Sequence, residues 1–432
     1  MKNIDWPQNY GDPSWFLHDR FGMFIHFGLY TLPSRHEWVM TREQIHPEKY
    51  KKYFHLFNPE SNCPDEWALK AEQAGMKYVV LTTKHHEGFV LWDSQYTDYK
   101  VTNTPYGKDL LKEFVDAFRK RGLKIGFYYS LIDWYHPHFT IDGLHPLRED
   151  RPEELNQRDF SKYAAYLHNQ VEELLTGYGK IDYLWFDFSY PDRDWGWSKG
   201  KGAGDWKSEE LEKLVLTLQP DIILNNRLDL QRGIQTPEQY QPKAPLTKNG
   251  KMVVWEACQT LNGSWGYDRD NLNWKSEEMI IKMLIDTVSK NGNLLLNIGP
   301  NGKGVFETKA VQLLDSLQNW MKNHAQSIYG ARESGFKAPV DCRLTQKRKR
   351  LYIHVFSWPY RTIHLETDGN KVEVEYARFM HDHSEVEFKV QEETGDGIFH
   401  HDVPIIESGE IVFLLPTQKP ETIVPVIEVF LK

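Results

Sequence analysis

Short apolar runs alternate with amphipathic segments through most of this 432-residue chain. Several runs are almost continuously hydrophobic, as is typical of strands buried on both faces of a parallel sheet. The expected strands are GMFIHFGLY (22–30), KYVVLTTKHH (77–86), LKIGFYYS (123–130), IDYLWFDF (181–188), DIILNNR (221–227), KMVVWEAC (251–258) and NLLLNIG (293–299).

Amphipathic segments expected to be helical lie between these runs, at 108–122, 159–179, 208–218 and 276–292. Many of them end in glycine, a common helix stop. Strand and helix in alternation indicate right-handed βαβ units. Seven or eight such units over about 330 residues predict a (β/α)₈-like, TIM-type barrel, here residues 1–335. The irregular stretch 190–207 is expected to form a long loop over the barrel mouth.

The pattern changes after residue 335, where short runs with period-2 alternation replace helical periodicity. Close spacing of such runs, with turn residues between them, is typical of an antiparallel β-sandwich. We therefore expect a second domain over residues 336–432, more a buttress than a binding module, with strands at 350–358, 362–368, 371–379, 385–392, 410–416 and 423–431.

Polar side chains gather at the trailing ends of the expected strands, where catalytic residues of a barrel lie. Asp187 in LWFDF stands out because a carboxylate inside an apolar run is costly to bury unless it is paired or used. For any one such residue, a satisfied buried polar group is the simpler interpretation. Their repeated position favours one shared site formed by His26, His85, His86, Tyr128, Tyr129, Asp187, Asn225, Asn226, Arg227 and Glu256.

A metal site is one chemistry that these residues permit. His85 and His86 form a candidate pair, yet neighbours on a strand point to opposite faces unless the strand has ended. The chain has no HExxH motif, and its three cysteines are far apart. The glycines at 200–204 lack the strand–turn–helix context of a nucleotide site, and no GxSxG elbow is present. We expect no metal and no cofactor.

A pair of carboxyl groups fits better. A retaining glycosidase uses one carboxylate as nucleophile and one carboxylic acid as proton donor. Asp187 is the expected nucleophile. Two glutamates compete for the acid/base role: Glu238 in GIQTPEQY and Glu256 in VVWEAC. Strand position alone does not choose between them, and Glu256 has a structural alternative as the partner of a nearby cation.

A set of motifs in fixed order resembles the α-L-fucosidases of glycoside hydrolase family 29. The motifs span residues 6–305 and include FGMFIHFGLYTLPSRHEW, VLTTKHHEGF, LWFD, NNR, TPEQY, WEACQTLNGSWGY and GNLLLNIGPNGKG. The resemblance implies a retaining exo-hydrolase of terminal L-fucose, on a barrel followed by a β-sandwich. It also implies Asp187 as nucleophile, Glu238 as acid/base with Glu256 as its rival, Arg227 beside the acid/base, and a fucose site of His26, Glu37, Trp38, His85, His86, Tyr128, Trp185 and Trp265.

Composition and charge limit the classes of partner that this chain is expected to bind. The net charge is −9 and no basic block is present, so nucleic acid is not expected. No apolar run approaches the roughly 18 residues that span a bilayer. The start MKNIDWPQNY lacks the apolar core of a secretory signal, and the odd cysteine count argues against a disulfide framework. We expect a cytoplasmic protein that acts on a fucosylated oligosaccharide or glycoconjugate, of open oligomeric state.

Two other functions compete with hydrolysis by a carboxyl pair. The first is a fucose-binding protein on a catalytically weak hydrolase scaffold, which the presence of both acids disfavours. The second is a metal-dependent hydrolase, for which loss of activity on chelation would be the sign.

Overall fold

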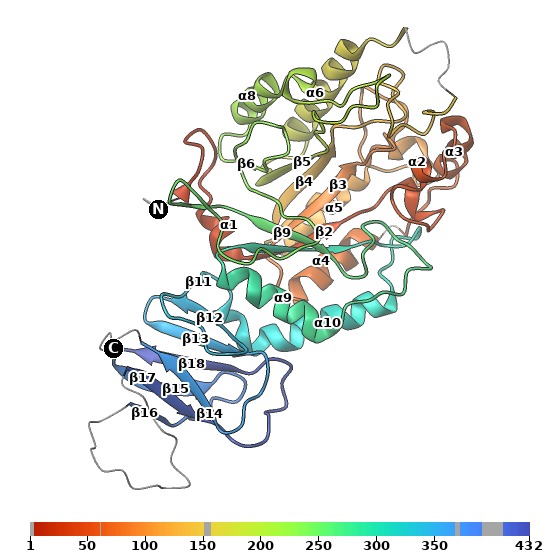
Figure 1. Ribbon diagram of the computed structural model, residues 1–432. Coiled ribbons are helices and arrows are strands. Elements are labelled where there is room, and N and C mark those ends of the chain that lie inside the picture. The colour runs from red at the N-terminus through yellow and green to blue at the C-terminus, as the bar shows by residue number, and fades with distance from the viewer. Residues whose placement is uncertain (1–3, 61, 151–156, 368–371, 391–408) are drawn as a thin grey trace, which may run out of the picture.

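The computed structural model describes residues 4–60, 62–150, 157–367, 372–390 and 409–432. A central parallel sheet surrounded by helices occupies most of the chain, and antiparallel sheets follow at the C-terminal end (Figure 1). Among the described residues, none of the helices is long and apolar enough to cross a membrane.

The central sheet has seven parallel strands in the order β6-β5-β4-β3-β2-β10-β9. All of them are buried except for the first residue of β4, which explains the hydrophobic runs in the sequence. Their bounds are β2 Phe21–Ile25, β3 Tyr78–Lys84, β4 Lys124–Ser130, β5 Tyr183–Asp187, β6 Ile223–Leu224, β9 Glu256–Thr260 and β10 Asn293–Ile298.

An irregular extended segment, residues 234–239, lies between the two edges of this sheet. Ile234 bridges Asn225 at the end of β6, and Glu238 bridges Cys258 in β9, both in parallel. Backbone hydrogen bonds from Gln235 N to Val254 O and from Cys258 N to Pro237 O, each 3.0 Å, continue the pairing. The sheet therefore closes on itself, and the predicted (β/α)₈-like barrel is confirmed.

In the described part of the chain, six helices cover the outside of the barrel, and all four expected helices are present. Helix α10 was not expected from the sequence. Its pattern is nevertheless amphipathic, with Leu313, Leu317 and Trp320 buried on one face, so the sequence did contain evidence for it. The helices are α4 Cys63–Gln73, α5 Leu110–Lys120, α6 Phe160–Gly177, α8 Ser208–Leu218, α9 Glu277–Ser289 and α10 Thr308–His324.

Shorter elements fill the connections. They are β1 Ile4–Asp5, α1 Ser14–Asp19, η1 Leu29–Thr31, α2 Val39–Arg42, α3 Pro47–Phe54, η2 Val101–Asn103, α7 Ala203–Trp206, β7 Thr247–Lys248, β8 Lys251–Val253 and η4 Ala325–Ser327.

The expected strand 251–258 is two strands. Its first part, β8, pairs with β1 and β7 in a separate three-stranded sheet, and its second part begins β9. Glu256 is therefore the first residue of a barrel strand. The sequence pattern predicts it at the trailing end of a strand, and that prediction is wrong. The expected strand 22–30 is also shorter, because β2 ends at Ile25 and η1 follows.

The described C-terminal strands form a five-stranded sheet, β11-β12-β13-β18-β15, and a three-stranded sheet, β14-β17-β16. Leu351, Ile353, Phe413 and Ile427 pack between them, and the predicted antiparallel sandwich is confirmed. The bounds are β11 Arg332–Glu333, β12 Cys342–Lys347, β13 Arg350–Val355, β14 Thr362–Glu366, β15 Val374–Phe379, β16 Phe388–Val390, β17 Glu410–Leu414 and β18 Val426–Leu431.

Parts of three expected strands, 362–368, 371–379 and 385–392, fall outside the described residues. The strand β11 already joins the sandwich sheet before residue 335, and the domain boundary at 335 stays a prediction.

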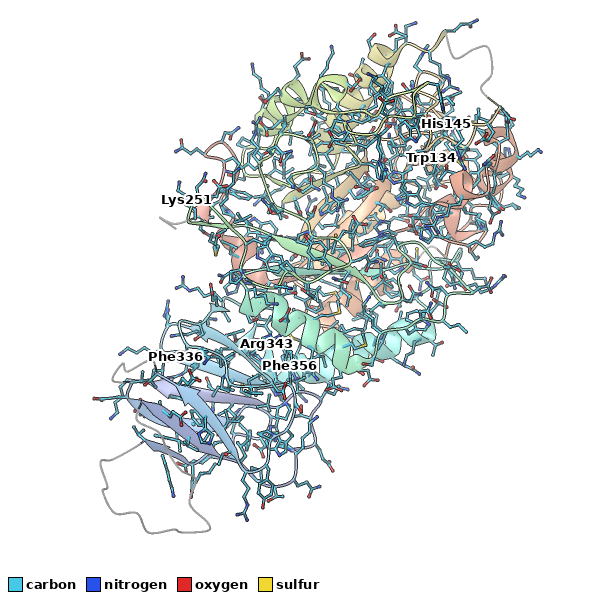
Figure 2. The ribbon with its side chains drawn as sticks, viewed as in Figure 1. Trp134, His145, Lys251, Phe336, Arg343 and Phe356 are labelled. Carbon is cyan, nitrogen blue, oxygen red and sulfur yellow. The ribbon has the colours of Figure 1, made fainter. Side chains whose placement is uncertain are left out.

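Helices α9 and α10 lie between the barrel and the sandwich (Figure 1). Asp286 of α9 accepts a hydrogen bond from Arg343 Nε of β12 at 2.8 Å and another from Lys290 Nζ at 2.7 Å. Arg343 and Phe356 lie together at this junction (Figure 2), with the guanidinium 5.3 Å from the ring centroid. Trp320 of α10 donates from Nε1 to Val424 O at 3.0 Å.

We expect Asp286→Ala to lower the apparent free energy of unfolding by about 1–3 kcal/mol, because it removes the carboxylate that pairs with two cations at the junction. Urea unfolding measures the change. Asp315→Ala is the matched control: Asp315 pairs with Lys70 at the surface, so its loss should cost about 0.5 kcal/mol or less. Equal effects of the two variants would contradict the role given to Asp286.

Candidate active site

One pocket lies at the carboxyl ends of the barrel strands and has about 420 Å³ of open space. Most of the predicted site residues line it, and those that do not are Glu37, Tyr129, Asn225, Asn226 and Glu256. The Tyr129 hydroxyl donates to Gln170 instead, and the Asn225 side chain bonds the backbone of Phe186. The lining residues are Phe24, His26, Trp38, His85, His86, Tyr128, Trp185, Asp187, Phe188, Arg227, Glu238 and Trp265.

Asp187 is the last residue of β5, and its side chain is held by two neighbours. Oδ2 accepts a hydrogen bond from the Tyr128 hydroxyl at 2.7 Å, and Oδ1 accepts one from Arg227 Nη1 at 2.7 Å. His86 Nε2 lies 4.0 Å from Oδ2. These contacts fix both oxygens of the carboxylate at the pocket wall.

The chain turns sharply directly after Asp187. Phe188 has a φ of +78°, a left-handed conformation that costs a bulky residue roughly 1–2 kcal/mol. Its ring packs against Trp38 and His86, with centroids 5.2 Å away in both cases. The packing holds the turn in place, and with it the direction in which Asp187 points.

Arg227 joins the two candidate catalytic acids. Its Nη1 donates to Asp187, and its Nη2 donates to Glu238 Oε2 at 2.7 Å. The guanidinium also lies over the Trp185 ring, 4.4 Å from the centroid. Burial lowers the pKa of Arg227, but the carboxylates of Asp187 and Glu238 outweigh that effect and raise it above its ordinary value. A guanidinium that contacts both acids holds the two carboxyl groups on the same side of the pocket, where both can reach one glycosidic bond.

The two acids differ in exposure. The Asp187 side chain is 12% exposed, whereas that of Glu238, on the segment that closes the barrel, is 41% exposed. One carboxyl group therefore lies inside the pocket, and the other lies at its rim in contact with solvent.

Three histidines form one side of the pocket, and burial keeps them neutral. Burial lowers the pKa of His26 and His86 to about 3 and lowers that of His85 well below its ordinary value. A neutral imidazole has one donor and one acceptor nitrogen. These side chains can therefore both donate to and accept from hydroxyl groups of a ligand.

The hydrogen bonds made by Asn297 and Ser130 determine the tautomers of His26 and His86. Asn297 Nδ2 donates to Trp265 O, so Asn297 Oδ1 must accept from His26 Nδ1 at 2.6 Å. The Ser130 hydroxyl donates to Ile132 O, so its oxygen accepts from His86 Nδ1 at 2.7 Å. The Nε2 atoms of both rings are left as acceptors.

Glu37 lies behind the pocket wall and not on it. It is 1% exposed, and its Oε2 accepts a hydrogen bond from Gly266 N at 2.8 Å. Its Oε1 receives no hydrogen bond from the described residues, and burial raises the pKa of Glu37 to about 7. Glu37 thus connects the segment that carries Trp38 with the turn that carries Trp265.

Aromatic rings line the remainder of the pocket. Trp265 lies 5.2 Å from the His26 ring, and Trp38 lies 4.9 Å from the His86 ring. Tyr128 stacks on Trp185 at 5.6 Å. Such walls suit a ligand with an apolar face and hydroxyl groups at its edges.

Glu256 lies in the barrel interior below the pocket and is completely buried. It accepts hydrogen bonds from the Tyr78 hydroxyl at 2.5 Å, the Tyr183 hydroxyl at 3.2 Å and Trp185 Nε1 at 3.3 Å. These donors are neutral, so the suggestion of a cation as its partner is wrong. Burial raises the pKa of Glu256 to about 7, although these hydrogen bonds oppose the shift.

Two pocket residues were not predicted. Phe24 lies on β2, two residues before His26, which follows the strand, so strand periodicity could have placed both on one face. Phe188 carried no periodic signal, because its direction depends on the turn after Asp187. Among the described residues, no group of three or more His, Cys, Asp or Glu side chains is arranged to hold a metal ion.

Comparison with known sequences gives consistent matches. The family described as Alpha-L-fucosidase matches residues 2–326. The plasma alpha-L-fucosidase of Homo sapiens is 31% identical over 383 residues, which cover 80% of this chain and 76% of the human protein.

Solved structures match over almost the whole chain. Alpha-L-fucosidase isoenzyme 1 from Paenibacillus thiaminolyticus has a TM-score of 0.87 and 42% identity, covering 97% of this chain and 98% of that one. A family 29 alpha-L-fucosidase from Bacteroides thetaiotaomicron, trapped as a covalent intermediate with 2-fluoro-fucosyl fluoride, has a TM-score of 0.84 and 26% identity, covering 100% and 98%.

The buried acid below the pocket predicts a pH-dependent stability. The folded-state pKa of Glu256, about 7, exceeds its unfolded value of about 4.5. Stabilisation by its proton is therefore complete below pH 4.5 and is lost as the pH rises through 7.

The free energy of unfolding lost on Glu256→Gln should therefore be larger at pH 5 than at pH 8, by about 2–3 kcal/mol. Urea unfolding of both proteins at the two pH values measures this difference. A loss that does not change with pH would contradict the raised pKa.

Proposed function

Because the chain belongs to the α-L-fucosidases of glycoside hydrolase family 29 and is a retaining α-L-fucosidase, we propose that Asp187 is its nucleophile and Glu238 its acid/base. The observation that carries this proposal is the single guanidinium of Arg227 in contact with both carboxyl groups, at 2.7 Å each.

In the first step, Asp187 attacks the anomeric carbon of the fucosyl group while Glu238 protonates the glycosidic oxygen, and the aglycone leaves. In the second step, Glu238 takes a proton from water, which attacks the fucosyl-enzyme and releases fucose. Two inversions give net retention. The partly exposed Glu238 side chain fits this exchange, since water must reach it in the second step.

The fucosyl group would occupy the pocket of neutral histidines and aromatic rings. The Nε2 acceptors of His26 and His86 suit sugar hydroxyl donors, with His85, Tyr128 and Trp38 beside them. Trp185 would form the floor, and Trp265 an apolar wall. Glu37 would act by holding the Trp38 and Trp265 segments together. The substrates we propose are terminal α-L-fucosyl groups on oligosaccharides or glycoconjugates.

Glu256 is the weaker candidate for the acid/base, although its pKa of about 7 would suit that role. A general acid must first lie within hydrogen-bond reach of the reacting atoms. Glu256 does not line the pocket, and Trp185 lies between it and Arg227. We propose instead that Glu256 positions Trp185.

The two competing functions have less support. A fucose-binding protein would not need two acids on one arginine, and the described residues offer no cluster of metal ligands for a metal-dependent hydrolase.

Asp187→Gly should lower kcat on an aryl α-L-fucoside by roughly a thousandfold or more, because no covalent intermediate can form. Added azide should restore part of the turnover and yield a β-fucosyl azide, since azide can occupy the space of the lost carboxylate. Product analysis by NMR identifies the anomer. Full activity without azide would exclude Asp187 as nucleophile.

Glu238→Ala should keep its first step on a substrate with a good leaving group, which needs little acid assistance. On a poor leaving group its rate should fall by about 10²- to 10⁴-fold, and the basic limb of its pH profile should disappear. Pre-steady-state kinetics separates the two steps. Glu256→Gln is the control and should keep both limbs. If Glu238→Ala keeps both limbs and Glu256→Gln loses one, the acid/base is Glu256.

A further inference from the structure

The chain that follows Glu238 has no regular structure of its own. Residues 239–246, all within the described part of the chain, form no helix or strand. Gln239, directly after Glu238, has a φ of +58°, a left-handed conformation that a residue other than glycine keeps only where its surroundings hold it. The Glu238 side chain is 41% exposed, so little packing fixes it. The direction of this carboxyl group therefore depends on what holds the residues that follow it.

Strand β9 holds one side of this segment. Gln239 N donates to Cys258 O at 3.0 Å. The Gln239 side chain donates from Nε2 to Thr260 Oγ1 at 2.9 Å and accepts from Thr260 N at 3.3 Å. The backbone and the side chain of this left-handed residue are thus both tied to the barrel, immediately after Glu238.

Helix α9 and the residue after it hold the other side. Gln241 Oε1 accepts a hydrogen bond from the Thr287 hydroxyl at 3.0 Å, and Pro242 O accepts one from Lys290 Nζ at 2.8 Å. The ring of Pro242 fixes its own φ and restricts the residue before it. Contacts at positions 241 and 242 are therefore transmitted along a stiff stretch of chain to Glu238, which lies just upstream.

Lys290 is the charged member of these contacts, and its side chain is mostly buried. It is 13% exposed, and a cation removed from water is costly unless it is paired. Its partner is Asp286, whose Oδ2 lies 2.7 Å from Lys290 Nζ and whose Oδ1 accepts from Arg343 Nε of β12 at 2.8 Å. Trp255 Nε1 donates to Lys290 O at 3.1 Å and fixes the backbone. An ion-pair chain thus runs from the sandwich through Asp286 to the carbonyl of Pro242.

We propose that Lys290 is a positioning residue for the acid/base, anchored to the sandwich through Asp286 and Arg343. The inference rests on the proposed role of Glu238. A general acid must lie within hydrogen-bond reach of the glycosidic oxygen, and a displacement of about 1 Å can cost about 10²-fold in rate. Without Lys290, the segment 239–246 loses a tie to α9, and Glu238 loses part of its alignment. The sandwich thus contributes to proton transfer without touching the substrate.

The first test compares two substrates on Lys290→Met. They are 2-chloro-4-nitrophenyl α-L-fucoside, whose leaving group needs little protonation, and phenyl α-L-fucoside, whose leaving group needs much. We expect kcat/KM, which reports the first step, to fall roughly tenfold on the phenyl fucoside, a part of the whole contribution of a general acid. On the other substrate we expect a change below about twofold, which also shows that the variant is folded. Lys290→Arg keeps a cation and a donor and should recover most of the loss.

Arg343→Met tests the sandwich end of the ion-pair chain, and it also serves where Lys290→Met does not fold. The loss on the phenyl fucoside should be smaller, roughly threefold, because Lys290 keeps its own ion pair. Lys282→Met is the matched control. Lys282 also belongs to α9, pairs with Glu278 at 2.7 Å and lies 5.3 Å from the Phe356 ring centroid at the same junction. Its loss should leave the ratio of the two kcat/KM values unchanged.

The Lys290→Met change in a Glu238→Ala background shows whether Lys290 acts through the acid. Once the carboxyl group is absent, Lys290→Met should cause no further loss on the phenyl fucoside. A full further loss there, or equal losses on both substrates in the single variant, would overturn the positioning role. An unchanged ratio in Arg343→Met would overturn the part given to the sandwich. If Glu238→Ala itself loses no more on the phenyl fucoside than on the other substrate, Glu238 is not the acid/base, and the proposed function fails instead.

Discussion

The contact of Arg227 with two carboxyl groups is the interaction on which the site depends. Asp187 belongs to β5, and Glu238 belongs to the extended segment that closes the barrel. Without the cation between them, the two neighbouring carboxylates would repel each other. Arg227 itself needs both, because a half-buried guanidinium over the face of Trp185 is costly without counter-ions.

Beneath this charged layer the barrel supplies polar groups that burial keeps uncharged below about pH 7. Trp185 is stacked on Tyr128 of the neighbouring strand and donates a hydrogen bond to Glu256. The histidines are neutral because burial disfavours their charged forms. Formal charge at the pocket is therefore confined to Asp187, Arg227 and Glu238. Such a low-dielectric surround makes each charge more effective on bound substrate than it would be in water.

The sequence predicted the barrel, the sandwich and most of the pocket, because strand-end position is a local pattern. Asp187 and His26 are polar residues at the ends of apolar runs. The sequence could not place Glu256, because 251–258 is one apolar run whose division between two sheets depends on pairing with distant strands. Likewise Glu238 follows Pro237 in a segment without alternation, and only its bridge to Cys258 places it at the mouth.

The two hollows that meet at Arg227 differ in the way they can select a ligand. The pocket is narrow, and its histidine acceptors are fixed by Asn297 and Ser130, so a ligand lacking a matching hydroxyl would leave buried groups unpaired. The second hollow, which shares Asp187, Arg227 and Glu238 with the pocket, is open, and its exposed side chains are hydrated when it is empty, so a mismatch there costs much less. A group bound in the buried pocket would therefore be selected more strictly than one bound in the open hollow, because the two sides of Arg227 differ in burial.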